Sequence, residues 1–233
     1  MSAICYNTIM ELLLVRHVET QGNLEHRFNG VTESEYSPFG IYMKSELHKE
    51  LLTQLKNVDS LRIYCSPISR AAKIAEELGA DLNCKPIYSD ELREFNFGIF
   101  DGLTPEEAEK RDHDAYFKWM NNHLYEQIPE GDSYEQKYNE ACGWIEKLVY
   151  DTQQQEQQSG KEQTVVLVGH GAVLRCMLTA LMDLPLDAGW HIDIPLGGIA
   201  LVNYTGDYGI LKRLYTPDYH GGSTAGYSKK FIH

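Results

Sequence analysis

The stretches "LLLVRHVETQGN" (residues 12–23) and "VVLVGHGAVLRC" (165–176) decide the fold class, because each runs apolar residues almost directly into a histidine. In both, four apolar residues are followed by one Arg or Gly and then by His17 or His170. Runs this apolar are typical of central strands covered on both faces of a parallel sheet. Since ligands bind beyond the carboxyl ends of such strands, both histidines are predicted to lie where chemistry takes place.

Apolar runs and helical patterns alternate along the chain, which is the signature of βαβ units. A third strand is predicted at "LRIYC" (61–65), and an antiparallel hairpin at a sheet edge is predicted from "IALVNY" (199–204) and "YGILKRLY" (208–215). The predicted fold class is therefore α/β, as a three-layer α/β/α arrangement with a central, mostly parallel sheet and an antiparallel edge hairpin.

Two Ser-Pro pairs mark predicted helix starts. Ser37 is the expected N-cap of the first helix, with Pro38 at the first helical position. The second pair, Ser66 and Pro67, repeats this pattern, and its helix is expected to end at Gly79.

Three further features follow from residue 104 onward. Thr104 and Glu107 are spaced as a capping box that opens another helix. A long amphipathic helix is predicted over residues 133–150, whose apolar residues share one stripe. The polar, low-complexity segment that follows, "DTQQQEQQSGKEQ" (151–163), is predicted to be an exposed connector.

Composition limits the class of protein. The 233 residues, 42% hydrophobic and 24% charged, predict a single domain over 1–233 with a sizeable core. The formal net charge of -13 argues against nucleic acids and anionic membranes as partners, because both would be repelled.

Cysteine usage and the two ends of the chain bear on the compartment. The five cysteines include no C-x-x-C pair, which favours reduced thiols over a disulfide framework. The N-terminal residues lack a basic start, and the apolar run at 10–15 is too short to span a bilayer, so we expect a cytoplasmic protein. The Gly/Ser-rich tail at 220–233 is expected to be mobile unless it packs over a pocket.

Residues around His17 are of the types that bind phosphate. Arg16 precedes the histidine, and Thr20 and Asn23 follow within a turn. Arginine offers a planar fork of donors that matches phosphate oxygens, and the neutral side chains add further polar groups. A phosphate site at the end of this strand is therefore predicted.

The chain resembles the histidine phosphatase superfamily, the phosphoglycerate-mutase-like enzymes that pass a phosphoryl group through a phosphohistidine. The resemblance covers nearly the whole chain, and its motifs occur in the family's order: "RHVETQGN", "FNGVTESEYSPFG", "CSPISRAAKIAEELG", "LREFNFGIFDGLTPEE" and "VLVGHGAVLR". One departure is Val18, which stands where the family usually has glycine after its nucleophilic histidine.

The resemblance implies a single catalytic domain over 1–233, in which a helical insertion at about 104–135 shapes the substrate pocket. It also implies a role for each matching residue. His17 would be the nucleophile and Glu94 the proton donor. The residues implied to hold the phosphoryl group are Arg16, Asn23, Arg70, His170 and the backbone N–H of Gly171. Thr20 and Arg27 are candidate substrate contacts. The implied activity is that of a histidine acid-type phosphatase, a phosphoric monoester hydrolase that needs no metal and no cofactor.

The chemistry of phosphoryl transfer suits these residue types. Attack on phosphorus needs a neutral imidazole, and the charges of Arg16 and Arg70 would lower the pKa of His17. The same arginines would stabilise the charge on the transferring oxygens without a metal. A leaving alkoxide needs a proton, which a carboxylic acid at Glu94 would supply.

Several of these residues have an ordinary structural interpretation as well. An arginine in a helical pattern, such as Arg70, is usually exposed, and Glu94 lies in a charged run. Arg175 is better explained by helix packing or an ion pair than by catalysis. The aromatic residues at the insertion either line a pocket or pack in the core; they are Tyr116, Phe117, Trp119 and Tyr125.

Other functions fit the sequence less well. A dinucleotide site at "VVLVGHGAVL" would need a third glycine where Leu174 stands, and none of the nine histidines has the H-E-x-x-H spacing of a metallohydrolase. A non-catalytic binding protein descended from the family would be expected to have lost a residue of the implied site, and none is lost.

Within the family, the main alternative to a phosphatase is a cofactor-dependent phosphoglycerate mutase. Mutases bind a substrate with both a carboxylate and a phosphate, through basic residues in the insertion. Here residues 112–137 contain only Lys118 and Lys137 and no arginine. We therefore expect hydrolysis of a small phosphate ester whose remaining part is neutral or aromatic; the exact ester and the oligomeric state, including a homodimer, stay open.

Overall fold

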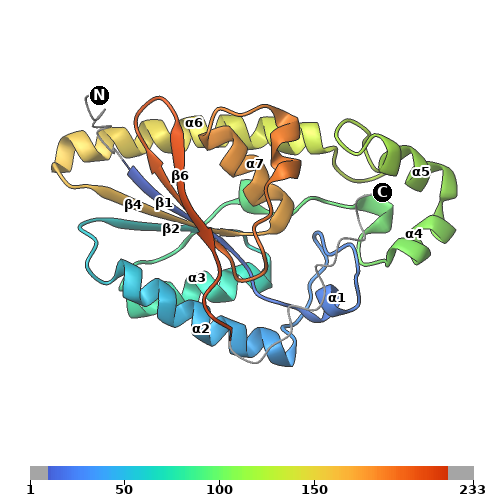
Figure 1. Cartoon of the computed structure of the whole chain (residues 1–233), viewed down its shortest axis with the longest axis horizontal. Helices are drawn as coiled ribbons and strands as arrows, with labels where there is room; N and C mark the ends of the chain where they lie inside the picture. Colours follow the sequence, from blue (N-terminus) through green and yellow to red (C-terminus); the bar gives the residue numbers. More distant parts are fainter. Residues whose placement is uncertain (1–9, 220–233) are drawn as a thin grey trace.

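The computed structural model describes residues 10–219, which are organised around one six-stranded sheet of order β3-β2-β4-β1-β5-β6 (Figure 1). The strands β1 to β4 pair in parallel, whereas β5 pairs antiparallel with both β1 and β6. The predicted fold class and edge hairpin are confirmed. The strands are β1 (Met10–Arg16), β2 (Leu61–Cys65), β3 (Ile87–Tyr88), β4 (Gln163–Gly169), β5 (Ile199–Tyr204) and β6 (Gly209–Tyr215).

The two histidine-bearing strands are neighbours at the centre of the sheet. β1 and β4 pair along their whole length, and Arg16 lies opposite Gly169 at their carboxyl ends. The backbone N–H of His17 continues this ladder by donating to the Gly169 carbonyl at 3.0 Å. The two strands therefore end in register, which delivers His17 and His170 to the same edge.

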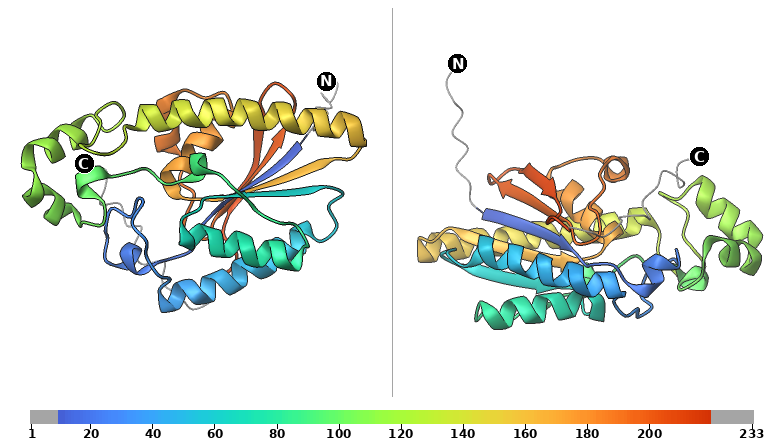
Figure 2. Two further views of the ribbon diagram at one scale, coloured as in Figure 1. Left: turned by 180° about the vertical axis from the view of Figure 1, so that it is seen from behind. Right: turned by 60° about the horizontal axis from the view of Figure 1, so that its bottom comes forward.

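Helices cover both faces of the sheet (Figure 2). The helices α2 (Pro38–Leu55) and α3 (Ser69–Asp81) share one apolar core with Leu13 and Val15 of β1. The helices α6 (Tyr134–Ser159) and α7 (Gly171–Leu181) share a second core with Leu12 and Leu14. Alternate residues of a strand point to opposite faces, so β1 contributes to both cores, and the three-layer prediction is confirmed.

Two of the predicted helix starts are as expected. The Ser37 hydroxyl accepts the Gly40 N–H at 2.8 Å, and Pro38 is the first helical residue of α2. At α4 (Pro105–Arg111), the Thr104 hydroxyl accepts the Glu107 N–H and the Glu107 carboxylate accepts the Thr104 N–H. This reciprocal capping box ties down the start of a short helix.

The prediction for the second Ser-Pro pair is wrong at both ends. The helix α3 begins at Ser69, after the apolar N-cap Ile68, and it runs through Gly79 to Asp81. The carboxylate of Glu33, from a distant loop, accepts the Ser69 N–H and so supplies the missing cap. Gly79 lies inside the helix, at a position that requires glycine because a Cβ there would overlap the Cys84 carbonyl.

The segment 151–163 is mostly exposed, as predicted, but it is not a connector over its whole length, because α6 continues to Ser159. Thr152 is fully buried in this extension, where its hydroxyl donates to the Leu148 carbonyl at 2.7 Å and contacts Arg62 of β2. Gly160 ends the helix in the left-handed conformation, with φ of +65°. A tertiary contact thus extends a helix whose polar sequence resembles a linker.

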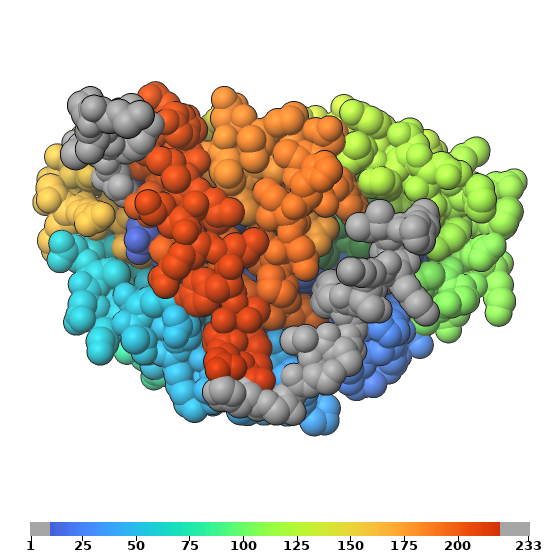
Figure 3. Space-filling model, viewed as in Figure 1, coloured from blue at the N-terminus to red at the C-terminus, as the bar shows by residue number. Residues whose placement is uncertain are grey.

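The short elements lie at the carboxyl edge of the sheet and beyond it. The helices α4 and α5 (His113–Asn121) form one end of the molecular surface (Figure 3). Trp119 of α5 is buried against Phe28 and Phe97, whereas Phe117 and Tyr125 are 56% and 55% exposed. The remaining short helices are α1 (Gln21–Leu24), η1 (Asp90–Leu92), η2 (Gly98–Phe100) and η3 (Leu186–His191).

The described residues bear on the predictions for the cysteines and for membrane spans. Within 10–219 the cysteines are free thiols: Cys65 and Cys176 are buried, and Cys84 and Cys142 are partly buried. No helix in this part of the chain is long and apolar enough to cross a bilayer. The fifth cysteine, Cys5, and the Gly/Ser-rich tail lie outside the described residues.

Candidate active site

The ends of β1 and β4 bring two buried imidazoles side by side. His17 is 3% exposed and His170 is fully buried, and their ring centroids lie 5.1 Å apart. Burial lowers the pKa of both histidines well below 6.5, and the positive charges of Arg70 and Arg16 lower them further. Both rings are therefore held in their neutral forms.

The hydrogen bonds of His17 define its tautomer. Its Nδ1 lies 2.7 Å from the Val18 carbonyl oxygen, which can only accept, so Nδ1 carries the proton. The Arg70 Nε–H donates to Nε2 at 3.3 Å. The lone pair of Nε2 therefore faces a guanidinium group. The Val18 side chain is fully buried in the core beneath the site.

Arg70 projects from the first turn of α3 and is 1% exposed, so the ordinary interpretation of an exposed helix arginine is wrong. Its terminal nitrogens donate to the carbonyls of Asn29 at 2.8 Å, Gly30 at 2.6 Å and Thr32 at 2.9 Å. The guanidinium is therefore fixed by one loop.

Arg16, the last residue of β1, is the second arginine whose charge acts on both imidazoles. Its Nη1 donates to the Ile194 carbonyl at 2.6 Å and lies 3.9 Å from the Asp193 carboxylate. Gly171, the first residue of α7, lies against this guanidinium, because a Cβ at Gly171 would be 2.9 Å from Cζ of Arg16. A glycine thus lets the N-terminus of α7 approach the arginine closely.

His170 is oriented by a residue that sequence reasoning assigned to a helix cap. Its Nε2 lies 2.8 Å from the Ser66 hydroxyl, which also accepts the Ile68 N–H. Its Nδ1 is buried and has no hydrogen-bond partner within residues 10–219. One ring nitrogen therefore has a partner among the described residues, and the other has none.

Glu94 lies at the same helix N-terminus as Gly171. Its carboxylate accepts the N–H groups of Phe95 at 2.9 Å, Val173 at 3.1 Å and Ala172 at 3.2 Å. The side chain is only 9% exposed, and its charge acts on Arg70. These contacts hold the carboxylate beside the arginines and histidines.

The other candidates have mainly structural contacts. The Thr20 hydroxyl donates to Oδ1 of Asn23 at 2.8 Å and accepts from Nδ2 of Asn29 at 2.9 Å. Arg27 forms ion pairs with Glu25 at 2.6 Å and Glu107 at 2.9 Å. A substrate contact by Thr20 or Arg27 stays a prediction.

Arg175 forms an ion pair, as the sequence suggested. Its Nη2 donates to the Asp193 carboxylate at 2.9 Å, and its guanidinium lies 5.8 Å from the Trp190 ring centroid. Asp193 thus lies between Arg175 and Arg16.

Sequence reasoning missed the residues that orient this cluster. Ser66, the 29–32 loop and Asp193 act through carbonyl, hydroxyl and carboxylate groups that carry no local signal of a site. Glycine at position 30, inside an otherwise polar segment, is the one hint that a backbone approaches closely there.

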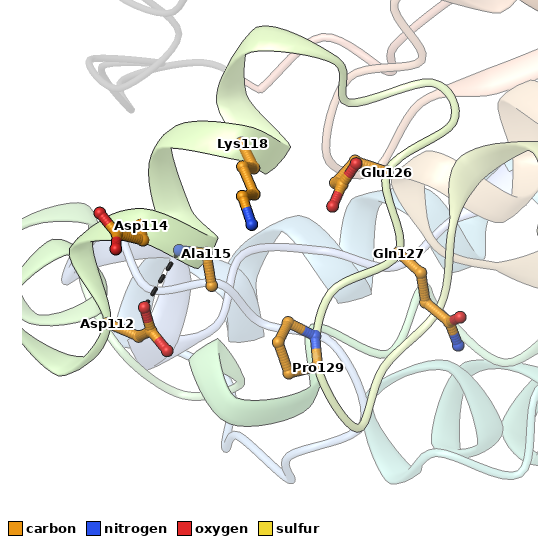
Figure 4. A pocket seen from close by; sticks show the side chains of 7 residues that line it. All are labelled: Asp112, Asp114, Ala115, Lys118, Glu126, Gln127 and Pro129. Atoms are coloured by element: carbon orange, nitrogen blue, oxygen red, sulfur yellow. Dashed lines mark hydrogen bonds between the residues drawn. The ribbon is translucent and has the colours of Figure 1, made fainter.

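A separate pocket of about 300 Å³ opens in the insertion (Figure 4). It is lined by Asp112, Asp114, Ala115, Lys118, Glu126, Gln127 and Pro129. The Asp112 carboxylate accepts the Ala115 N–H as the cap of α5, and none of the lining residues belongs to the histidine cluster. Within residues 10–219 no group of three or more His, Cys, Asp or Glu side chains could hold a metal ion.

Comparison with known proteins defines the class to which this fold and site belong. The model of the histidine phosphatase superfamily (branch 1) matches residues 12–217. The chain therefore belongs to the histidine phosphatase superfamily, and the resemblance seen in the sequence is confirmed.

Individual relatives carry phosphatase and mutase names. The chain is 27% identical over 182 residues to phosphoserine phosphatase 1 of Hydrogenobacter thermophilus, covering 78% of this chain and 81% of that protein. It is 26% identical over 201 residues to a Shigella boydii protein named as a probable phosphoglycerate mutase, and the match covers 84% of this chain and 86% of that protein.

Solved structures share the fold. The α-ribazole phosphatase of Shigella flexneri superposes with a TM-score of 0.76 at 22% identity, over 89% of this chain and 97% of that one. The protein YhfR of Bacillus stearothermophilus superposes with a TM-score of 0.70 at 29% identity, over 87% of this chain and 95% of that one.

Proposed function

We propose that this protein hydrolyses small phosphate monoesters, with Nε2 of His17 as the nucleophile and without a metal. The observation that supports this most directly is the state of His17: its imidazole is neutral, its proton is on Nδ1, and its Nε2 lone pair faces Arg70. A phosphoryl group that binds Arg70 is thereby presented to this lone pair.

The phosphoryl oxygens have several donors within the cluster. Arg16 and Arg70 both supply positive charge near the histidines, and the Gly171 N–H lies at the positive end of α7. The orphan Nδ1 of His170 and the amide nitrogen of Asn23 are further donors. Positioning and charge stabilisation are the main requirements of phosphoryl transfer, and these groups meet them.

The reaction has two steps. Nε2 of His17 attacks phosphorus as the ester P–O bond breaks, and Glu94 gives its proton to the leaving alkoxide. The Glu94 carboxylate then takes a proton from water, whose oxygen attacks the phosphohistidine and releases inorganic phosphate and neutral His17. The lowered pKa of His17 keeps the nucleophile unprotonated in mildly acidic solution, which supports the acid-type class.

The substrate is a small-molecule ester whose remaining part is neutral or aromatic. The relatives named for phosphoserine and α-ribazole support a small-molecule phosphate ester, and the few basic residues of the insertion favour a remaining part without a second acidic group. The helices of the insertion, rich in aromatic residues, would shape the pocket. The mutase name of another relative keeps phosphoglycerate mutase as the alternative.

The test is hydrolysis of p-nitrophenyl phosphate in the presence of a chelator. We expect turnover by the wild type and none by His17→Ala. When the wild-type reaction is stopped during turnover, His17 should be found phosphorylated. The control His48→Ala removes a histidine on α2 that is paired with Asp81, and it should leave turnover unchanged. Retained turnover in His17→Ala would exclude this mechanism, and interconversion of phosphoglycerates without net hydrolysis would favour the mutase.

A further inference from the structure

The loop at residues 29–32, which holds Arg70, is itself held by a carboxylate outside the cluster described above. Asp101 follows η2, and its two carboxylate oxygens accept the N–H of Val31 at 3.0 Å and of Thr32 at 2.9 Å. The same carboxylate accepts the Phe97 N–H at 3.3 Å. One side chain therefore links the 29–32 loop to the segment that carries Glu94.

The fit between Asp101 and the loop is close. A Cβ at Gly30 would overlap both the Asp101 carboxylate and the Phe95 carbonyl oxygen, so only glycine allows the loop this near. The carbonyl of the same glycine accepts from Arg70 at 2.6 Å. The position of the Arg70 guanidinium thus depends on how closely the loop lies against Asp101.

The charge of Asp101 also reaches the arginine. Burial lowers the pKa of the Arg70 guanidinium, and the carboxylates of Glu94, Glu33 and Asp101 oppose this effect. Asp101 thereby helps to keep a positive charge inside the protein as well as fixing the loop around it.

Other contacts keep the loop attached if Asp101 is changed. The Glu33 carboxylate accepts the Ser69 N–H at the start of α3, and the Gly102 N–H donates to the Phe28 carbonyl at 2.8 Å. Loss of the Asp101 contacts should therefore loosen the loop without detaching it.

We propose that Asp101 is a positioning residue for the reaction: its hydrogen bonds to the 29–32 loop orient the Arg70 guanidinium toward Nε2 of His17. This inference rests on the proposed function, in which Arg70 binds the transferring phosphoryl group. Asp101 itself touches neither His17 nor any other member of the cluster by hydrogen bond in residues 10–219.

The test compares Asp101→Asn with the matched control Asp132→Asn. Asp132 also holds the Glu94 segment, because its carboxylate accepts the Asn96 N–H at 2.9 Å, but it makes no hydrogen bond to the 29–32 loop within residues 10–219. We expect kcat/KM for p-nitrophenyl phosphate to fall about tenfold to hundredfold in Asp101→Asn, because small misplacements of a phosphate clamp have effects of this order. The control should change by less than about threefold.

A double-mutant cycle with Arg70→Lys separates positioning from general destabilisation. If Asp101 acts through Arg70, then Asp101→Asn should have little further effect on kcat/KM in the Arg70→Lys background. An equal effect in both backgrounds would overturn the proposal. Gly30→Ala, which pushes the loop away while keeping the carboxylate, should act in the same direction as Asp101→Asn.

A second measurement does not depend on turnover. NMR titration of the His17 Cε1–H should show a higher pKa in Asp101→Asn than in the wild type, because the Arg70 charge moves away from the ring. The charged and titratable groups next to this ring are Arg16, Arg70 and His170, and Glu94 acts on Arg70. An unchanged titration with a native melting temperature would overturn the inference, whereas absence of hydrolysis by the wild type would overturn only the proposed function.

Discussion

His17 is neutral because it is buried next to two guanidinium groups, so that a third positive charge would be costly. The same surroundings act on His170, which is fully buried and lies near the same arginines. In the proposed reaction, the neutral imidazole of His17 would attack phosphorus and that of His170 would donate through Nδ1. They also make the stability of the protein depend on pH.

Stability should fall as the pH drops below about 6.5. Both histidines have a lowered pKa in the folded protein, so the unfolded chain binds protons at pH values where the folded chain does not. Each histidine should remove up to about 1.4 kcal/mol per pH unit from the free energy of unfolding in this range. Urea unfolding between about pH 7.5 and 5.5 measures how the free energy of unfolding depends on pH, and His170→Gln should make this dependence about half as steep. A free energy of unfolding that does not change with pH in the wild type would contradict the lowered pKa of the two histidines.

The helix α6 shows how an element's two glycines can have opposite effects. Gly143 lies in the exposed middle of the helix, with no atom within 4 Å of the place where a Cβ would be. Gly160 ends the helix with φ of +65°, a conformation that favours glycine. The first glycine weakens the helix, and the second allows it to end before β4.

Alanine at these two positions should therefore change stability with opposite signs. Gly143→Ala should raise the free energy of unfolding by about 0.5–1 kcal/mol, because glycine is a poor residue in a helix interior. Gly160→Ala should lower it by about 1 kcal/mol, because alanine is strained at positive φ. Chemical denaturation of both variants tests this pair, and equal signs would mean that α6 does not end at Gly160 as described.

At the scale of the whole molecule, the sheet separates two apolar cores. Ile74 of α3 belongs to the core shared with α2, and Ile145 of α6 belongs to the core shared with α7. Both side chains are nearly fully buried, at 2% and 4% exposed. Within residues 10–219 the buried side chains form two separate clusters, one on each face of the sheet.

Mutations in the two cores should add. Ile74→Val and Ile145→Val should each lower the free energy of unfolding by about 0.5–1.5 kcal/mol, as removal of one buried methyl group usually does. The double variant should match the sum within about 0.5 kcal/mol, because distant sites are independent. A deviation above about 1 kcal/mol in urea unfolding would show that the strands transmit strain between the layers.

Features that depend on neighbouring residues in the sequence were predicted well, whereas features that depend on contacts between distant segments were not. The strands that carry His17 and His170 were predictable because their apolar runs are local and unbroken. The start of α3 was not, since its cap comes from Glu33 in a distant loop. Nor was the extension of α6, where Thr152 contacts Arg62 across the core surface.

By itself, the sequence determined the fold class, the family and the types of residue at the site, because hydrophobic periodicity and motif order are written along the chain. Only the tertiary structure decided which ring nitrogen of His17 is unprotonated and which loop holds the Arg70 guanidinium. It also showed that Asp101 secures that loop. These features depend on hydrogen bonds between segments far apart in the sequence, and such contacts leave no local pattern.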